Sequence, residues 1–111
     1  MTDTVLTRAP VAQDEVDRLR EWYAELETRD AEVVETLRAE GMLTETAFLD
    51  TSGPTPYLYV YMEAEDVDAA LAAAADSAFD IDEQHHAVLA ETLAGDWEHL
   101  DRIGHFTNPE R

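Results

Sequence analysis

Cysteine and lysine are both absent from this 111-residue chain. Without cysteine the protein has no disulfide framework, no thiolate nucleophile and no cysteine-ligated metal. No apolar run approaches the roughly 18 residues that a membrane span needs, and the first residues lack the basic and apolar segments of a secretion signal. These absences predict a cytoplasmic protein that does not enter a membrane.

Basic side chains are also scarce, because seven arginines stand against 26 acidic residues and the net charge is −19. Nucleic-acid binding requires clustered basic side chains that neutralise phosphates, so no nucleic-acid partner is expected. Apolar residues make up 45% of the chain and recur periodically, which argues against disorder. Because concentrated salt screens the repulsion between like charges, the composition predicts a folded protein adapted to high salt.

The chain length fits a single domain over residues 1–111, with a frayed tail at 107–111. The expected elements are a strand at 4–8, a helical region at 11–40, strands at 42–50 and 57–63, helices beginning after Asp66 and near Asp80, and a strand at 97–106. This β-α-β-β-α-β order is the ferredoxin-like arrangement. It predicts an α+β fold with a four-stranded antiparallel sheet and helices on one face.

Asp30 lies in the middle of the apolar stripe of the first helical region, one turn after Leu26 and one turn before Val33. A buried carboxylate at this position would have a shifted pKa and would be a candidate general acid or base. The alternative, which we favour, is a break near residues 28–30 that returns Asp30 to solvent.

The strand at 57–63 alternates almost perfectly. It has Tyr57, Tyr59, Tyr61 and Glu63 on one face and Leu58, Val60 and Met62 on the other. The aliphatic face is expected to meet the helices, which leaves the tyrosines on the outer face. A tyrosine ring has an apolar body and a polar tip, so Tyr59 and Tyr61 suit both a dimer interface and a ligand-binding cavity. We therefore expect a homodimer that packs through this face.

The strand expected at 97–106 carries His99, Asp101 and His105 on one face. If Leu100 and Phe106, on the other face, meet the helices, these three side chains join the tyrosines in a lumen enclosed by the dimer. Their chemistry makes them candidate catalytic residues, since histidine titrates near neutral pH. The placement depends on strand phase, because a slip of one residue turns every side chain to the opposite face.

His85 and His86 lie in the later helical region, with His85 on the apolar stripe. Neighbouring residues on a helix do not face each other, so the pair cannot chelate one metal ion. We expect a buried, hydrogen-bonded His85 and a solvated His86, and we predict neither a metal site nor a cofactor. His85, Trp22 and Tyr23 are candidate ligand-binding residues.

Several segments resemble a family of small haloarchaeal proteins of unknown function. They are residues 21–26 (EWYAEL), 36–41 (TLRAEG), 48–49 (FL) and 61–66 (YMEAED). The resemblance covers roughly residues 5–75 and implies no activity. More distantly, the chain resembles the dimeric α/β-barrel superfamily, in which two ferredoxin-like chains pack sheet against sheet.

That superfamily includes antibiotic-biosynthesis-type monooxygenases, muconolactone isomerases and rhamnose mutarotases. The mutarotases are the most similar in layout, but their catalytic histidine lies in the first helix. This chain has Leu26 at roughly that place and no histidine before His85. The resemblance therefore implies the fold and the dimer and does not carry over the mutarotase mechanism.

Two hypotheses about function follow. In the first, the protein binds or isomerises a small polar or aromatic metabolite in the barrel lumen without a cofactor. In the second, it is a non-catalytic interaction or structural homodimer whose sheet face serves only to dimerise. The sequence does not decide whether the protein is an enzyme.

Overall fold

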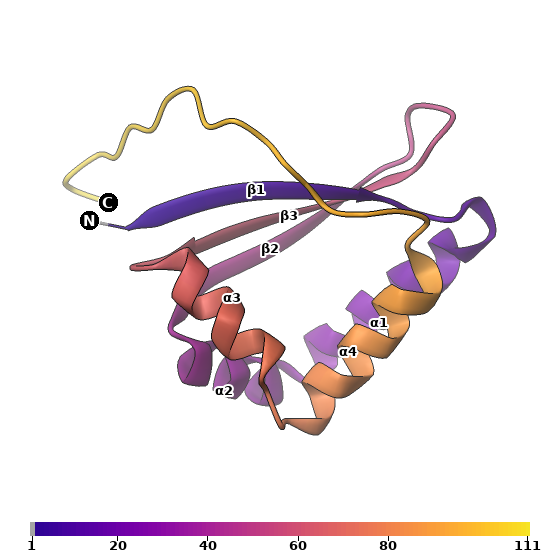
Figure 1. The fold of residues 1–111 in the computed structure, drawn as a ribbon, viewed down its shortest axis with the longest axis horizontal. Coiled ribbons are helices and arrows are strands. Elements are labelled where there is room, and N and C mark those ends of the chain that lie inside the picture. The colour runs from indigo at the N-terminus through magenta and orange to yellow at the C-terminus, as the bar shows by residue number, and fades with distance from the viewer. Residues whose placement is uncertain (1) are drawn as a thin grey trace.

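The computed structural model describes residues 2–111. Its elements are β1 (Asp3–Pro10), the 3-10 turn η1 (Gln13–Glu15), α1 (Val16–Thr28), α2 (Asp30–Glu40), β2 (Met42–Asp50), β3 (Tyr57–Ala64), α3 (Val67–Ala75), α4 (Asp80–Thr92) and β4 (Glu98–His99). The strands form one antiparallel sheet in the order β2-β3-β1-β4. The helices cover one face of this sheet (Figure 1). The predicted ferredoxin-like α+β fold is confirmed.

The first helical region is broken at Arg29, whose backbone angles (φ −110°, ψ 34°) depart from helical values. The Arg29 N–H donates to the carbonyl groups of Glu25 and Leu26, which closes α1. Its guanidinium group pairs with Glu25 on α1 and Glu32 on α2, so one side chain bridges the two helices. The break favoured from the sequence is confirmed, and Asp30, the first residue of α2, is exposed.

Two helix ends follow directly from the sequence. Gly41 ends α2 in the left-handed region at φ 77°, a conformation that glycine adopts without a steric penalty. The side chain of Asp66 accepts a hydrogen bond from the backbone N–H of Ala69 at 3.0 Å. This cap satisfies one of the free N–H groups at the start of α3.

The core lies between the sheet and the helices. It is built from Val11, Leu19, Met42, Leu58, Val60, Met62, Ala64, Val67 and Ala70. The central strand β3 supplies four of these residues at alternating positions, and Tyr57, Tyr59 and Tyr61 alternate with them on the outer face. Each large aliphatic side chain buried here stabilises the fold by about 1.5–3 kcal/mol. The sequence placed Leu58, Val60 and Met62 on the helix-covered face of β3 and the tyrosines on the outer face, and this prediction is confirmed.

The last strand is much shorter than predicted, since β4 contains only Glu98 and His99. The prediction of a strand to Phe106, with Leu100 and Phe106 packed against the helices, is wrong. Because Thr7 pairs with His99 in an antiparallel ladder, a strand reaching residue 103 would already be opposite Asp3, where β1 begins. The rest of the chain passes over the face of the sheet away from the helices (Figure 1), and Phe106 is 96% exposed.

None of the helices within residues 2–111 combines the length and apolar character needed to cross a membrane.

Candidate functional site

A cleft opens on the helix side of the sheet. Helix α1 packs on α4 and α2 packs on α3, and the two pairs are inclined like the sides of a V whose open end is closed by the sheet (Figure 1). The cleft between them has a volume of about 940 Å³, and its walls include Leu26, Leu37, Leu71 and Leu89. A largely apolar cleft of this size falls in the range of small-molecule binding sites.

Five acidic residues line this cleft, and three of them come from three different elements: Glu40 at the end of α2, Glu45 on β2 and Asp82 in the first turn of α4. Glu45 is opposite Met62 in the β2–β3 ladder, which places it on the helix-covered face. Burial, then the charges of Asp82 and Glu45, raise the pKa of Glu40 to about 7. Burial and the charge of Asp82 also raise the pKa of Glu45.

Glu40 and Glu45 were missed by the sequence reasoning, although a signal for Glu45 was present. Glu45 shares the phase of Ala47 and Leu49, which face the helices opposite Val60 and Leu58. A carboxylate in the apolar phase of a strand is a sign of a functional site. Both side chains remain in contact with solvent, so protons can enter and leave.

His85 projects from α4 and forms part of the cleft wall. Its Nδ1 accepts a hydrogen bond of 2.8 Å from Nε1–H of Trp22. The planes of the two rings differ by 23° and their centroids are 6.2 Å apart, and Tyr23 meets the imidazole edge-on at 5.9 Å. Burial and the adjacent charge of His86 lower the pKa of His85 to about 4, so it is neutral at pH 7. The expected hydrogen bond of His85 and the exposure of His86 are confirmed, whereas His85 is half-buried and not fully buried as expected.

Trp22 and Tyr23 occupy different positions relative to the cleft. Trp22 is buried, at 8% exposure, behind the His85 ring. Tyr23 lines the cleft itself. Burial and the charge of nearby Glu45 raise the pKa of Tyr23 above its ordinary value. The Tyr23 hydroxyl therefore stays protonated and can donate a hydrogen bond to a ligand.

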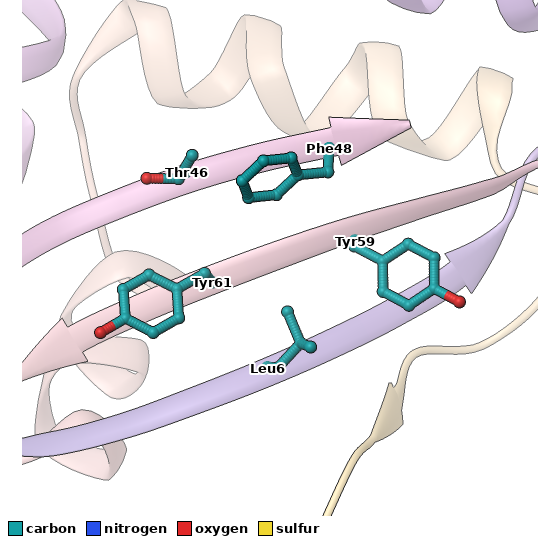
Figure 2. Close-up of a pocket in the computed structure, with 5 residues that line it drawn as sticks. All are labelled: Leu6, Thr46, Phe48, Tyr59 and Tyr61. Carbon is teal, nitrogen blue, oxygen red and sulfur yellow. The ribbon is translucent and has the colours of Figure 1, made fainter. Parts of the chain in front are cut away.

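The opposite face of the sheet carries the tyrosines, as predicted. A shallow depression of about 500 Å³ is lined there by Leu6, Thr46, Phe48, Tyr59 and Tyr61 (Figure 2). At its edge the guanidinium group of Arg8 lies 4.3 Å from the centre of the Tyr57 ring and donates to the Tyr59 hydroxyl. None of the five lining residues carries a carboxylate or an imidazole, so this face offers apolar and phenolic contacts.

None of the predicted residues His99, Asp101 and His105 lines the depression on the tyrosine face. His99 is opposite Thr7 in the β1–β4 ladder, and Thr7 is buried beneath the helices, so His99 lies on the cleft side. Asp101 and His105 belong to the exposed C-terminal segment. The grouping with the tyrosines is wrong for His99, because pairing with β1 turns it to the helix side. Asp101 and His105 lie beyond β4, where the part of the chain that the structure describes has no strand pairing to direct their side chains toward the tyrosines.

The structure thus divides the predicted site residues into four groups. Tyr23, Asp30, His85 and His99 line the cleft, Tyr59 and Tyr61 line the outer depression, Trp22 is buried behind His85, and Asp101 and His105 are exposed in the C-terminal segment. Within residues 2–111, no cluster of three or more His, Asp or Glu side chains is arranged to hold a metal ion.

Comparison with known proteins places the chain in a family. The family of unknown function DUF6176 matches residues 2–110, so the chain belongs to that family. A search of curated proteins finds no significant match.

Solved structures with the same fold are distant in sequence. Rv0793 from Mycobacterium tuberculosis is 16% identical, with 96% of this chain and all of that chain covered and a TM-score of 0.61. A conserved protein from Methanosarcina mazei Go1 is 18% identical over 90% of this chain and 89% of its own, with a TM-score of 0.60. A protein named antibiotic biosynthesis monooxygenase is 19% identical over 94% of this chain and 100% of its own, with a TM-score of 0.58. These similarities show the fold alone.

Proposed function

We propose that this DUF6176 protein binds a small, largely apolar molecule in the cleft and exchanges a proton with it through Glu40 and Glu45. The observation that carries the proposal is the cleft of about 940 Å³, whose largely apolar lining includes these two carboxyl groups. A carboxyl group with a pKa of about 7, as for Glu40, is present in both protonation states at neutral pH. That is the requirement for general acid–base catalysis.

The reaction class that suits this pair is isomerisation by proton transfer. One carboxylate removes a proton from a carbon next to a carbonyl group, and a carboxylic acid returns a proton at another position of the same molecule. Atoms and electrons balance without an oxidant or a reductant. Asp30 and His99, at the cleft wall, are proposed to contact polar groups of the bound molecule.

The ligand site proposed here replaces the lumen that the sequence suggested. The outer depression has no lining carboxylate or imidazole, whereas the cleft contains several of both. A molecule held in the depression would meet aromatic, aliphatic and threonine side chains and no carboxyl or imidazole group. The cleft is therefore the better-supported location for chemistry.

A second candidate function, a non-catalytic homodimer, is favoured by the outer face. Phe48 on this face is 60% exposed, next to Tyr59 and Tyr61 (Figure 2). Exposed apolar patches of this kind mark protein interfaces. We propose that two copies pack through this face. If the cleft takes no ligand, dimerisation remains as the function of the fold.

The experiment that tests ligand binding uses indanone, a small bicyclic ketone, added to ¹⁵N-labelled protein in molar KCl. We expect saturable amide shifts at residues of the cleft wall, such as Leu26, Leu71 and Leu89. Saturable shifts confined to the outer face, or no saturable shift at all, would contradict the proposal.

A matched pair of variants on α3 checks the location. Ala74 lines the cleft and Ala72 is exposed. Ala74→Phe fills part of the cleft and should weaken indanone binding by about tenfold or more, equivalent to about 1.4 kcal/mol. Ala72→Phe adds the same ring outside the cleft and should leave the affinity unchanged. Equal affinities for the two variants would place the probe elsewhere.

A further inference from the structure

The hydrogen bond between Trp22 and His85 fixes which nitrogen of the imidazole carries the proton, and therefore which nitrogen can donate to a ligand. An indole N–H can only donate a hydrogen bond. The atom that faces it at 2.8 Å, Nδ1 of His85, must therefore be an acceptor with no proton of its own. A neutral imidazole has one protonated nitrogen, so the proton is on Nε2.

Protonation of the ring would disrupt this contact. A charged imidazole carries protons on both nitrogens, and Nδ1–H would then point at the N–H of Trp22. Trp22 is buried at 8% exposure and is held by α1, so its indole has little room to turn away. The contact therefore disfavours the charged ring as well as the other neutral tautomer.

The charged and titratable groups around His85 come from three elements. Asp82 and His86 lie near it on α4. The charge of His86 lowers the pKa of His85, and the charge of Asp82 raises it. Tyr23 on α1 packs against its edge, and Glu45 on β2 is close to Tyr23. His85 is thus a neutral ring in a cleft wall that is otherwise rich in carboxylates.

We propose that Trp22 is a positioning residue that holds His85 in the neutral Nε2–H tautomer, so that His85 is a dedicated hydrogen-bond donor to an oxygen acceptor of the cleft ligand. Nδ1 is occupied by Trp22, so Nε2 is the ring nitrogen left to donate to a molecule in the cleft that His85 lines. The ligand class is a molecule with an apolar body and a carbonyl-type oxygen. This assignment of the ligand rests on the proposed function, whereas the tautomer does not.

The tautomer can be measured on the unmodified protein without any ligand. Two-dimensional ¹H–¹⁵N correlation of the imidazole rings at pH 7 should show a protonated Nε2 and an unprotonated, hydrogen-bonded Nδ1 for His85. A spectrum with the proton on Nδ1, or a charged ring, overturns the proposal. No variant has to fold for this test.

The role of Trp22 is tested by Trp22→Phe, which keeps an aromatic ring and removes the N–H donor. We expect the pKa of His85 to rise by up to about one unit, because a neutral hydrogen bond contributes about 0.5–1.5 kcal/mol. The control is Trp97→Phe, since Trp97 is 39% exposed and the indole that donates to His85 is that of Trp22. A His85 pKa that is unchanged by Trp22→Phe means that Trp22 does not position the ring.

The donor role is tested with a matched pair of probes, indanone and indane, which differ by one carbonyl group. In His85→Phe the affinity for indanone relative to indane should fall about threefold to tenfold, the value of one lost hydrogen bond. His105→Phe, in the exposed C-terminal segment, should leave that ratio unchanged. A ratio that is unaltered in His85→Phe overturns the donor role. If neither probe binds the wild-type cleft, the proposed function fails, while the tautomer measurement still decides the role of Trp22.

Discussion

Thr7 on β1 and His99 on β4 face each other across the edge of the sheet, and this pairing directs the imidazole toward the helices. The next pair, Arg8 and Glu98, forms an ion pair of 3.2 Å on the opposite face. The two faces of the sheet consequently carry different chemistry. The helix side carries Glu45 and His99, whereas the outer side carries the tyrosines, Phe48, Arg8, Glu63 and Glu98.

The net charge of −19 predicts a stability that depends on salt. Mutual repulsion of the carboxylates opposes the compact state, and the Debye length falls from about 10 Å at 0.1 M salt to about 3 Å at 1 M. The thermal midpoint should therefore rise between 0.1 M and molar KCl, as followed by far-ultraviolet circular dichroism. A midpoint that does not change over this range would remove the inference of adaptation to high salt.

The outer sheet face predicts a homodimer in solution. Light scattering in molar KCl should give twice the mass of one chain, and Phe48→Glu should shift the protein toward the monomer because it places a charge in the apolar patch. Val34→Glu, on α2 at 37% exposure, adds the same charge on the helix side and should leave the dimer intact. A wild-type protein that scatters as a monomer would contradict the proposed interface.

The carboxylate pair predicts catalysed exchange of the acidic hydrogens of a bound ketone. In D₂O the protein should accelerate replacement of the hydrogens next to the indanone carbonyl, followed by ¹H NMR. Glu45→Gln and Glu40→Gln should each slow the exchange by about a hundredfold, the lower end of the range for general acid–base catalysis. Glu65→Gln changes an exposed residue before α3 and serves as the control. If the wild-type protein binds indanone and does not accelerate hydrogen exchange, the protein binds ligands in the cleft but does not catalyse the proposed isomerisation.

The raised pKa of Glu40 predicts how stability changes with pH. Between about 4.5 and 7 the folded protein holds a proton on Glu40 that the unfolded chain has released. Stability from this group therefore falls as pH rises through this window and is constant above it. His85 has the opposite effect. Between pH 4 and 6.5, approximately, the unfolded chain holds a proton on His85 that the folded protein has released, so stability from this group rises as pH rises.

The contribution of Glu40 is isolated by comparing the wild type with Glu40→Gln in urea unfolding at pH 5 and pH 8. The loss of stability on going from pH 5 to pH 8 should be smaller in Glu40→Gln, since a glutamine cannot release a proton. His85 contributes equally to both proteins and cancels in the comparison. Identical pH profiles would show that Glu40 has an ordinary pKa in the folded state.

The sequence by itself determined the order of the elements and the faces of the central strand. The alternation of tyrosines with Leu58, Val60 and Met62 has period two, and only the aliphatic set can pack against helices. Gly41 and Asp66 are local signals that depend on neighbouring backbone groups alone. The break at Arg29 was also anticipated, since a continuous helix would have placed Asp30 in the apolar stripe.

Only the tertiary structure decided the candidate site. The phase of β4 follows from its pairing with β1, whose residues lie about ninety positions earlier, and no local pattern at residues 97–106 encodes that register. The cleft unites Glu40, Glu45 and Asp82 from three elements, and Trp22 reaches His85 across 63 positions of sequence. The raised pKa of Glu40 depends on burial of its carboxyl group. The imidazole tautomer of His85 depends on the Trp22 N–H that donates to it. Both arise when the helices close over the sheet, and neither is a property of residues that are adjacent in the chain.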